Sequence, residues 1–352
     1  MRVLYIGVSD PASTTRHRAD AMRRLGAEVI HLDPLQAMGQ RLHGWAGRLH
    51  YRSGYLLLAP AVQAWLQAEL QRTPSLDLIW VDSGELLSAA TLQLLRRVGV
   101  PIVLFNHDDP TGTRDRLRFM GLRQAIPFYD LCIVVREANV AEYKHHQARD
   151  VLRSWMTYDE VRHQVDIANR PVPTHLQSDV AFIGGNHKRE GRDLFLLQLI
   201  DAGLNPAIWG DGWERSVHWD RLRPHWRGPS VAGQDYVDAL RGAKLCLGLL
   251  SRANRDQHTT RTMEIPAAGG LLCGQRTDEH QALYREGEEA VFWSDPQECI
   301  QRCRELLADA ERREHIRAAG RARLLRNQCG NEDLVRRAWA RLGMRTPVQQ
   351  RA

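Results

Sequence analysis

Short apolar runs alternate with amphipathic stretches along most of the chain, and this alternation restricts the fold more than any other feature. The runs are rich in β-branched and aromatic residues, as buried strands are. In the first part of the chain they are RVLYIGV (2–8), EVIHL (28–32), DLIWVD (77–82), PIVLF (101–105) and DLCIVV (130–135). Helix-like segments such as 16–25, 55–70 and 86–98 separate them, which is typical of a parallel sheet covered by helices.

A second series of strand-like runs follows a break in this pattern. Two prolines interrupt the polar segment 167–177, and we place an interdomain linker there. The later runs are DVAFIGG (179–185), PAIWG (206–210), KLCLGLL (244–250), GLLCG (270–274) and AVFW (290–293). The sequence therefore predicts an α/β protein of two doubly wound, Rossmann-like domains, 1–170 and 171–328, facing a central cleft. A C-terminal helix and basic tail at 329–352 could pack back on the first domain.

Composition indicates a globular chain without membrane spans. Of the 352 residues, 43% are apolar and 26% charged, and no window approaches the ~20 apolar residues that cross a bilayer. Six cysteines are scattered without a Cys-x-x-Cys pair, which fits reduced thiols in the cytoplasm. Cys299 and Cys303 could share a helix face, but no matching histidine pair accompanies them, and we predict no metal site.

The positive charge is concentrated at the end of the chain. The formal net charge is +6, and residues 301–352 hold thirteen arginines against six acids, so this segment carries +7 and the rest −1. Apolar residues recur every four positions there and would pack inward, which favours an arrangement with the arginines on solvated helix faces. The alternative is peripheral contact with an anionic surface, such as the inner face of the membrane or an acidic acceptor. We expect no nucleic-acid partner.

The polar loop after KLCLGLL carries the strongest candidate site. In SRANRDQHTTRTMEIPAAGG (251–270), Thr259 or Thr260 is a suitable N-cap for the short helix that follows. The free backbone N–H groups at such a helix end bind anions. Hydrogen bonds from Arg261 to a phosphate are worth ~1.5–3 kcal/mol, against ~0.3–1 kcal/mol for the helix dipole. Arg261 is therefore the predicted phosphate ligand.

Glu264 lies one turn further along the same helix. A carboxylate accepts hydrogen bonds and donates none, which matches a vicinal diol such as ribose, with the phosphate at the helix tip. Gly269 and Gly270 would end the helix and let the next strand pass close by. The alternative is that Glu264 only pairs with Arg261 on an exposed helix face.

Two other segments of the second domain follow strands and could hold the same ligand. Glycines let the backbone approach a ligand closely, and basic side chains can reach a diphosphate. The residues concerned are Gly184, Gly185, Lys188, Arg189, Trp209 and Gly210. Trp209 is a candidate wall for a nucleobase; the alternative is that Trp209 and Trp213 are core residues.

Loops after strands of the first domain supply polar side chains to the expected cleft. VSDPASTTRHR (8–18) and WVDSGELL (80–87) both leave strand ends. The residues predicted to face the cleft or an acceptor are Ser13, Thr14, Arg16, Asp82 and Glu85. For the first of these loops, a plain N-cap turn is the alternative.

FNHDDP (105–110) is the sharpest feature of the first domain. His107, Asp108 and Asp109 leave the end of a strand together, and Pro110 prevents a regular continuation. Carboxylates placed beside a histidine are often the source of a general base. We predict these three residues to be catalytic; the alternative is that one aspartate caps the following helix.

Residues 261–324 resemble the C-terminal part of glycosyltransferases of the two-domain GT-B type, in particular the CgeB-like (spore-maturation-protein-like) branch. The shared order is a glutamate-containing helix ending in Ala-Ala-Gly, a strand, EGEEAVFWSD (286–295) and two helices. The first half matches loosely, through FNHDDP and YDLCIVVREANVAEY (129–143).

The resemblance carries expectations for single residues. In that superfamily the helix glutamate contacts the donor ribose, which implies this role for Glu264. Many retaining members carry an earlier glutamate with seven residues between; Asp256 stands at that position and departs from the usual glutamate. The family generally lacks a metal-dependent Asp-x-Asp arrangement, which implies a metal-independent enzyme with no cofactor besides its co-substrate.

We therefore predict a glycosyltransferase that moves a hexosyl or related group from a UDP-, GDP- or dTDP-linked donor. The acceptor would be a glycan, a protein or a small molecule. An inverting transfer would need a base such as those in FNHDDP, whereas a retaining transfer can use the leaving phosphate. The alternatives are a nucleotide-sugar epimerase of similar fold and a non-catalytic member that binds a nucleotide sugar or a partner protein.

Overall fold

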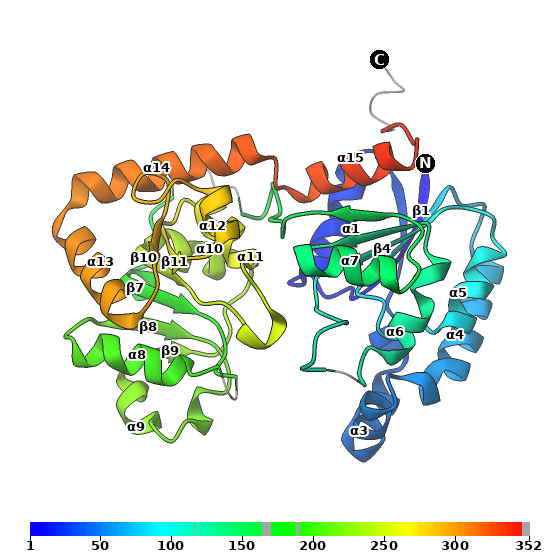
Figure 1. Ribbon diagram of the computed structural model, residues 1–352, viewed down its shortest axis with the longest axis horizontal. Helices are drawn as coiled ribbons and strands as arrows, with labels where there is room; N and C mark the ends of the chain where they lie inside the picture. Colours follow the sequence, from blue (N-terminus) through cyan, green and yellow to red (C-terminus); the bar gives the residue numbers. More distant parts are fainter. Residues whose placement is uncertain (116, 164–169, 188–189, 347–352) are drawn as a thin grey trace. The chain divides into compact units, whose positions relative to one another are not determined.

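The chain forms two compact units, each built around a six-stranded parallel sheet (Figure 1). A computed structural model describes residues 1–115, 117–163, 170–187 and 190–346. The first unit is Met1–Trp155 together with the segment from Asn331 onward, and the second is Met156–Gly330. The predicted α/β class with two doubly wound sheets is confirmed. The first unit ends before the expected position 170, because β6, its last strand in the chain, already ends at Arg153.

The first sheet has the strand order β2-β1-β3-β4-β5-β6. Its strands are β1 (Arg2–Ile6), β2 (Glu28–Leu32), β3 (Leu78–Asp82), β4 (Ile102–Asn106), β5 (Leu131–Val134) and β6 (Val151–Arg153). The helices are α1 (Thr14–Arg24), α2 (Pro34–Ala37), α3 (Gly44–Arg52), α4 (Ala59–Arg72), α5 (Ala89–Arg96), α6 (Met120–Ala125), α7 (Glu137–His145) and α15 (Asn331–Arg341). The strand order reverses between β1 and β3, whose carboxyl ends are thus the place where such sheets bind ligands.

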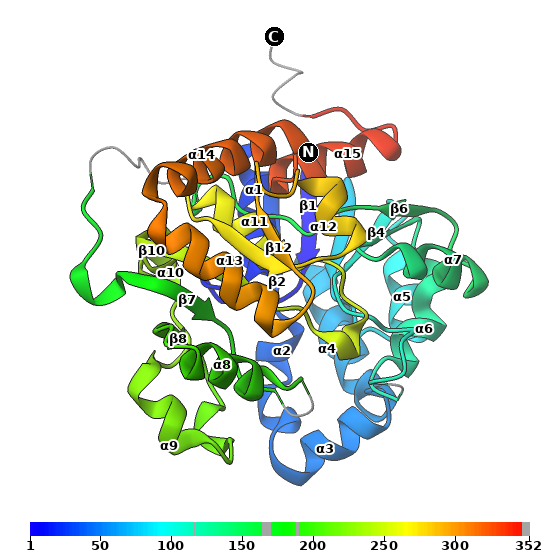
Figure 2. The ribbon, with the colours of Figure 1, turned by 60° about the vertical axis from the view of Figure 1, so that its left-hand side comes forward.

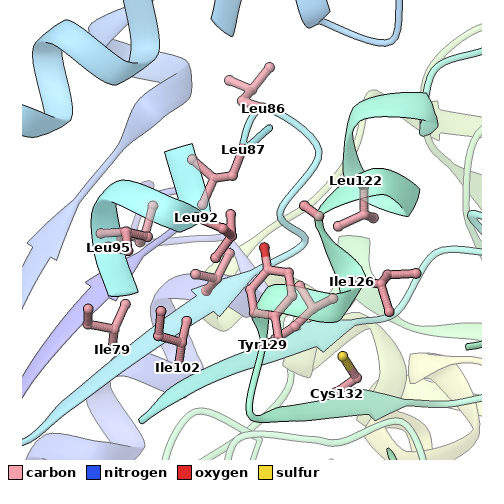
Figure 3. Close-up of a cluster of buried hydrophobic side chains, with 14 of the residues drawn as sticks. Ile79, Leu86, Leu87, Leu92, Leu95, Ile102, Leu122, Ile126, Tyr129 and Cys132 are labelled. Carbon is pink, nitrogen blue, oxygen red and sulfur yellow. The ribbon is translucent and has the colours of Figure 1, made fainter. Parts of the chain in front are cut away.

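One face of this sheet packs against α4, α5 and α6 through a single apolar cluster. Figure 3 shows part of it, with Ile79 and Ile102 from the sheet facing Leu92 and Leu95 of α5. The period-two alternation of the strands places these side chains on one face. This core holds the strands in place, and with them the loops that follow the carboxyl ends of β1, β3 and β4.

The C-terminal helix α15 belongs to the first unit and contacts α1 (Figure 2). Arg24 donates to Glu332 at 2.7 Å, and Arg341 forms two hydrogen bonds with Asp150, at 2.7 and 2.9 Å. In α14 (Ala310–Asn327), Arg323 and Arg326 lie 3.8 and 3.2 Å from the carboxylate of Glu289. The C-terminal arginines with intramolecular acceptors include Arg313, Arg317, Arg323, Arg326, Arg336, Arg337 and Arg341. Much of the basic charge predicted for a solvated face or an anionic surface is therefore used within the chain.

The second sheet has the order β12-β11-β10-β7-β8-β9. Its strands are β7 (Ser178–Ile183), β8 (Pro206–Trp209), β9 (Trp226–Gly228), β10 (Ala243–Gly248), β11 (Leu272–Gln275) and β12 (Val291–Trp293). The helices are α8 (Arg192–Asp201), α9 (Trp219–Leu222), α10 (Gly233–Gly242), α11 (Thr260–Ala267), α12 (Asp278–Leu283), α13 (Pro296–Ala308) and α14. The order reverses between β7 and β10. We call the place where the strand order of a sheet reverses its switch point, and the loops after β7 and β10 border that of the second sheet.

All ten strand-like runs of the sequence contain a strand of these sheets. The two remaining strands, β6 and β9, each have three residues and lie at sheet edges. In the described part of the chain no helix is long and apolar enough to cross a membrane.

Candidate functional site

Helix α11 begins at Thr260, behind a capping box of Thr259 and Thr262. The backbone N–H of Thr259 donates to the hydroxyl oxygen of Thr262 at 3.1 Å. That hydroxyl also contacts Nε2 of His280 at 2.9 Å, while Nδ1 of His280 lies 2.6 Å from the carbonyl of Gln275. Burial lowers the pKa of His280 to about 4. A neutral ring that donates from Nδ1 and accepts at Nε2 satisfies both contacts and anchors the start of the helix.

Arg261 and Glu264 form an ion pair on the first turn of α11. Nη1 of Arg261 lies 2.5 Å from Oε2 of Glu264. The glutamate side chain is 4% exposed, whereas the arginine side chain is 32% exposed. The pair expected by the alternative interpretation is therefore present, but its carboxylate is buried rather than on an exposed helix face.

Two residues that the sequence did not indicate complete this cluster. The hydroxyl of Tyr236 donates to Oε2 of Glu264 at 2.5 Å, and its ring lies 4.7 Å below the Arg261 guanidinium. Nδ1 of His163 accepts from the N–H of Asp159, so Nε2 carries the proton that faces Oε1 of Glu264 at 3.8 Å.

The electrostatic balance keeps the Glu264 carboxylate ionised. Burial by itself would raise its pKa, but the positive charge of Arg261, followed by His163 and the hydrogen bond from Tyr236, lowers the pKa below the usual value. Burial would lower the pKa of Arg261, but Tyr236 and Glu264 raise it above the usual value. The site thus offers a fixed negative acceptor beside an arginine whose side chain is partly exposed.

The cluster lies at the switch point of the second sheet. Nε of Arg261 donates to the carbonyl of Ile183, the last residue of β7, at 3.2 Å. The loops after β7 and β10 are joined by Glu190, whose carboxylate accepts from the hydroxyl of Ser251 and the backbone N–H of Arg252, at 2.9 and 3.0 Å. The predicted helix is therefore positioned at the edge where such sheets bind ligands.

A second arginine, missed in the sequence, shares this edge with Arg261. Arg192, the first residue of α8, donates to the carbonyl of Gly185 at 2.8 Å, and its buried Nε has no partner among the described residues. Burial lowers the pKa of Arg192, the charge of Glu190 opposes this shift, and the nearby charge of Arg261 adds to it. Two guanidinium groups close enough to repel each other form a site that an anion would stabilise.

The predicted glycines pack against one another. A Cβ on Gly210, which has a φ of +144°, would lie 2.3 Å from the carbonyl oxygen of Gly184, and one on Gly185 would lie 3.1 Å from a backbone oxygen of Asp211. The loops after β7 and β8 thus need glycine for their mutual approach. Lys188 and Arg189 lie outside the described residues.

The tryptophans of IWGDGW are core residues. Trp209 is 3% exposed and Trp213 is fully buried. The indole N–H of Trp213 donates to the carbonyl of Gly184 at 3.0 Å. This burial favours the core interpretation over a nucleobase wall at Trp209. Asp256 lies in the loop before α11, half-buried, and helps to hold the charge on Arg192.

In the first unit Asp82 belongs to a buried network at the end of β3. Its oxygens accept from Nε and Nη2 of Arg18 at 2.6 and 3.0 Å, and from the hydroxyls of Tyr5 and Thr15 at 2.6 and 3.2 Å. Burial would raise the pKa of Asp82, but Arg18 lowers it, with a smaller contribution from His107. We had expected Asp82 to face a ligand in the cleft. With four internal donors it is instead a structural anchor.

The loop before α1 forms an N-cap turn, as its alternative interpretation held. The hydroxyl of Ser13 accepts from the backbone N–H of Arg16 at 3.1 Å. Thr14 is the first residue of the helix, and Nε of Arg16 pairs with Asp20 at 3.0 Å. Beside it, at the switch point of the first sheet, lies a cavity of about 70 Å³, which is too small for a sugar-sized ligand.

Asp108, one of the predicted catalytic residues, shares an arginine with the predicted cleft residue Glu85. Arg118 pairs with Glu85 at 2.7 Å and lies 3.8 Å from Asp108, so one guanidinium holds both acids. Nδ1 of His107 is buried without a hydrogen-bond partner in the described chain.

Asp109 serves a buried turn. Its Oδ1 accepts from Asn139 at 2.9 Å, and a Cβ on Gly112 would lie 2.3 Å from its Oδ2. The next helix begins only at Met120, so neither aspartate of FNHDDP caps a helix.

Three buried thiols meet in the second unit. The sulfur atoms of Cys273, Cys299 and Cys303 lie within 4.8 Å of one another. The group contains no fourth ligand among the described residues, and all three side chains belong to the apolar core. The absence of a metal site stays a prediction.

Comparisons with known proteins agree with this architecture. No curated protein matches the sequence. Sucrose-phosphate synthase from Thermosynechococcus elongatus is 13% identical, with a TM-score of 0.69 over 97% of this chain and 99% of that one. Anabaena HepE, solved with UDP-glucose, is 13% identical, with a TM-score of 0.64 over 97% and 99%. A candidate UDP-N-acetylglucosamine 2-epimerase from Listeria monocytogenes is 10% identical, with a TM-score of 0.57 over 99% and 98%.

These structures are similar to the chain in fold at low sequence identity. A family model described as glycosyl transferase-like matches residues 189–331, the part that contains α11 and the loops around it. The finer resemblance to the CgeB-like branch stays a prediction. Residues 189–331 thus match a glycosyl transferase-like family, and the chain as a whole has the GT-B fold of the glycosyltransferases among its structural neighbours.

Proposed function

We propose that the protein transfers a hexosyl or related group from a nucleotide diphosphate sugar to an acceptor, and that the second unit holds the donor. The observation that carries the proposal is the cluster of Arg261, Glu264 and Arg192 at the switch point of the second sheet. It combines two closely placed cations, a helix N-terminus and an ionised acceptor, the groups needed by a diphosphate and a ribose diol.

Donor binding would exchange the partners of this cluster. In the structure the charge of Glu264 is balanced by Arg261. Because Arg261 is partly exposed and Glu264 is not, the arginine is the member that can turn toward a diphosphate. Glu264 would then accept from the ribose hydroxyls, while Tyr236 and His163 keep the carboxylate in place. Positive groups beside the diphosphate would also stabilise the charge that develops as it leaves.

For the remaining residues we propose the roles predicted from the sequence. Thr260 would present its backbone N–H to the phosphates, whereas the N–H of Thr259 stays in the capping box. Lys188, Arg189 and the Gly184–Gly185 turn would lie beside it, and Asp256 near the sugar. Asp108 and His107 are the proposed acid–base residues for the acceptor; Asp109 is less suited, because Asn139 holds it in a buried turn. We propose a UDP-, GDP- or dTDP-linked donor, no metal or other cofactor, and a glycan, protein or small-molecule acceptor in the cytoplasm.

Epimerisation of a nucleotide sugar is the second candidate function, because the Listeria monocytogenes protein described as a candidate epimerase is similar over nearly the full length of both chains. An epimerase needs no acceptor. Conversion of a donor sugar alone into its isomer would select it, whereas transfer to an added acceptor would select the glycosyltransferase. Donor binding without either reaction would indicate a non-catalytic member of the fold.

The direct test is a thermal-shift screen of UDP, GDP, dTDP and their sugars. A ligand at ~100 times its dissociation constant stabilises the folded state by ~2.7 kcal/mol. For a unit of about 175 residues this corresponds to a rise in Tm of ~5–10 °C. Monophosphates should shift the Tm less, since they engage fewer of the cationic groups. If no nucleotide diphosphate or sugar nucleotide shifts the Tm, the proposed function is wrong.

A further inference from the structure

Helix α3 of the first unit has no buried residue. Figures 1 and 2 both show it extending away from the sheet of its unit. Trp45 is 79% exposed, and Leu49 is 48% exposed. In the adjacent turn Leu56–Leu58, Leu57 is 58% exposed. Clustered large apolar side chains on the surface of a folded unit mark an interaction site.

One face of α3 combines apolar and basic side chains. Trp45, Arg48, Leu49 and Arg52 follow the i, i+3, i+4, i+7 spacing, which places them on the same side of the helix. All four are exposed. Since no described residue of the unit buries these side chains, they are in water unless another surface binds to this face.

The charged residues of α3 and its flanking sequence are basic. Asp115, an acid that contacts the helix at 2.9 Å from the Tyr51 hydroxyl, is paired with Arg114 and Arg118. Between Asp33 and Glu69 the sequence contains no acidic residue, but it contains Arg41, Arg48 and Arg52. In the part of the chain that the structure describes, these three arginines form no salt bridge. The C-terminal arginines, in contrast, have mostly intramolecular acceptors. The arginines on and beside α3 thus form an uncompensated basic surface of the first unit.

We propose that the protein binds the surface of an anionic phospholipid bilayer through α3. Trp45 and Leu49 would insert at the boundary between headgroups and acyl chains, where tryptophan is enriched, while Arg48 and Arg52 bind lipid phosphates. A second copy of the chain is a poorer occupant, because a symmetric contact through this face would place like charges together. This inference does not depend on the proposed function.

Vesicle flotation of the full chain tests the proposal. The chain should float with phosphatidylcholine vesicles that contain 30% phosphatidylglycerol, much less with phosphatidylcholine alone, and less at high salt. Each arginine near an anionic surface contributes about five-fold to the partition coefficient, so Arg48→Gln with Arg52→Gln should reduce binding by about 25-fold. Trp45→Ser should reduce it at least ten-fold.

Matched variants separate α3 from other surfaces. Arg336→Gln with Arg345→Gln removes the same charge from the C-terminal segment. Val217→Ser removes a side chain of the second unit that is 92% exposed. Both controls should bind vesicles within a few-fold of the wild type. Circular dichroism should be unchanged in every variant, because each altered side chain is exposed or partly exposed.

A fluorescent label reports insertion directly. The six native cysteines are buried, so a thiol introduced by Leu49→Cys or by Val217→Cys reacts selectively with an environment-sensitive fluorophore. Anionic vesicles should shift the emission of the label at position 49 to the blue and leave that at position 217 unchanged.

Three results would overturn the proposal. The first is no binding of the wild type to the anionic vesicles. The second is loss of binding in the C-terminal control but not in the α3 variants. The third is a wild-type dimer in solution that Trp45→Ser dissociates, which would make this face an interface between copies of the chain.

Discussion

The substitution Glu264→Gln tests whether the buried carboxylate of α11 recognises a diol. A ribose hydroxyl that donates to a charged group contributes ~1.5–3 kcal/mol, and much less when the acceptor is neutral. We therefore expect UDP to bind ~10- to 100-fold more weakly to Glu264→Gln. Isothermal titration calorimetry measures this ratio.

A ligand without the diol makes the test specific. Wild-type protein should prefer UDP over 2′,3′-dideoxy-UDP by about the same factor, and Glu264→Gln should bind the two ligands nearly equally. Retention of the wild-type preference in Glu264→Gln would refute the assignment of the diol to this carboxylate.

The substitution also changes stability, which needs its own control. Removing one partner of a fully buried ion pair costs ~3–5 kcal/mol, but Arg261 is 32% exposed and can turn to water. We expect a loss of ~1–3 kcal/mol in the free energy of unfolding. Tyr236→Phe removes a hydrogen bond to the same carboxylate at a similar cost, yet it keeps the charge. It should therefore bind UDP within a few-fold of the wild type.

Three further predictions concern the scaffold. His280 has a pKa of about 4 in the folded protein and ~6.5 in the unfolded chain. Its contribution to stability is therefore present above pH ~6.5 and is lost as the pH falls toward 4. Between these two pH values, the free energy of unfolding measured in urea should fall by ~3 kcal/mol more in the wild type than in His280→Gln. Gly210→Ala should lower the Tm more than Gly228→Ala, since both have φ near +145° but only Gly210 has a backbone oxygen within 3 Å of the added Cβ. In urea unfolding, Asp82→Asn should lower the free energy of unfolding by ~3–5 kcal/mol. Asp20→Asn, at a side chain that is 22% exposed, should lower it by under ~1 kcal/mol.

The sheets were predictable because most of their strands are runs of buried apolar residues. Ten runs of apolar residues identify ten strands, since a central parallel strand needs such a run. The edge strands β6 (VLR) and β9 (WRG) were missed because of their short length and mixed polarity, since the edge strands β2 and β12 lie in more apolar runs and were predicted. Three residues with mixed polarity carry no periodic signal, so their pairing is decided by the neighbouring strand rather than by their own sequence.

The candidate site was predictable only within one helix. Thr259, Arg261 and Glu264 are close in sequence, so helix geometry alone brings them together. Tyr236 and His163 reach the same carboxylate from 28 and 101 residues away, and neither lies in a recognisable motif. The sequence did contain a signal for Arg192, which is the last cation of the basic segment after the Gly184–Gly185 turn. The prediction instead named Lys188 and Arg189, because they lie closer to that turn.

The two units contain comparable carboxylate–arginine pairs, and the difference between them indicates which one is suited to bind a ligand. Asp82 and Glu264 both lie at the switch point of their sheet, and each accepts from an arginine and from a tyrosine hydroxyl. The Arg18 side chain is only 3% exposed, so it has no other partner to turn to and its pair is structural. The 32% exposure of Arg261 gives that arginine a route to an anion in solvent, and its departure would leave Glu264 with an acceptor oxygen for a ligand.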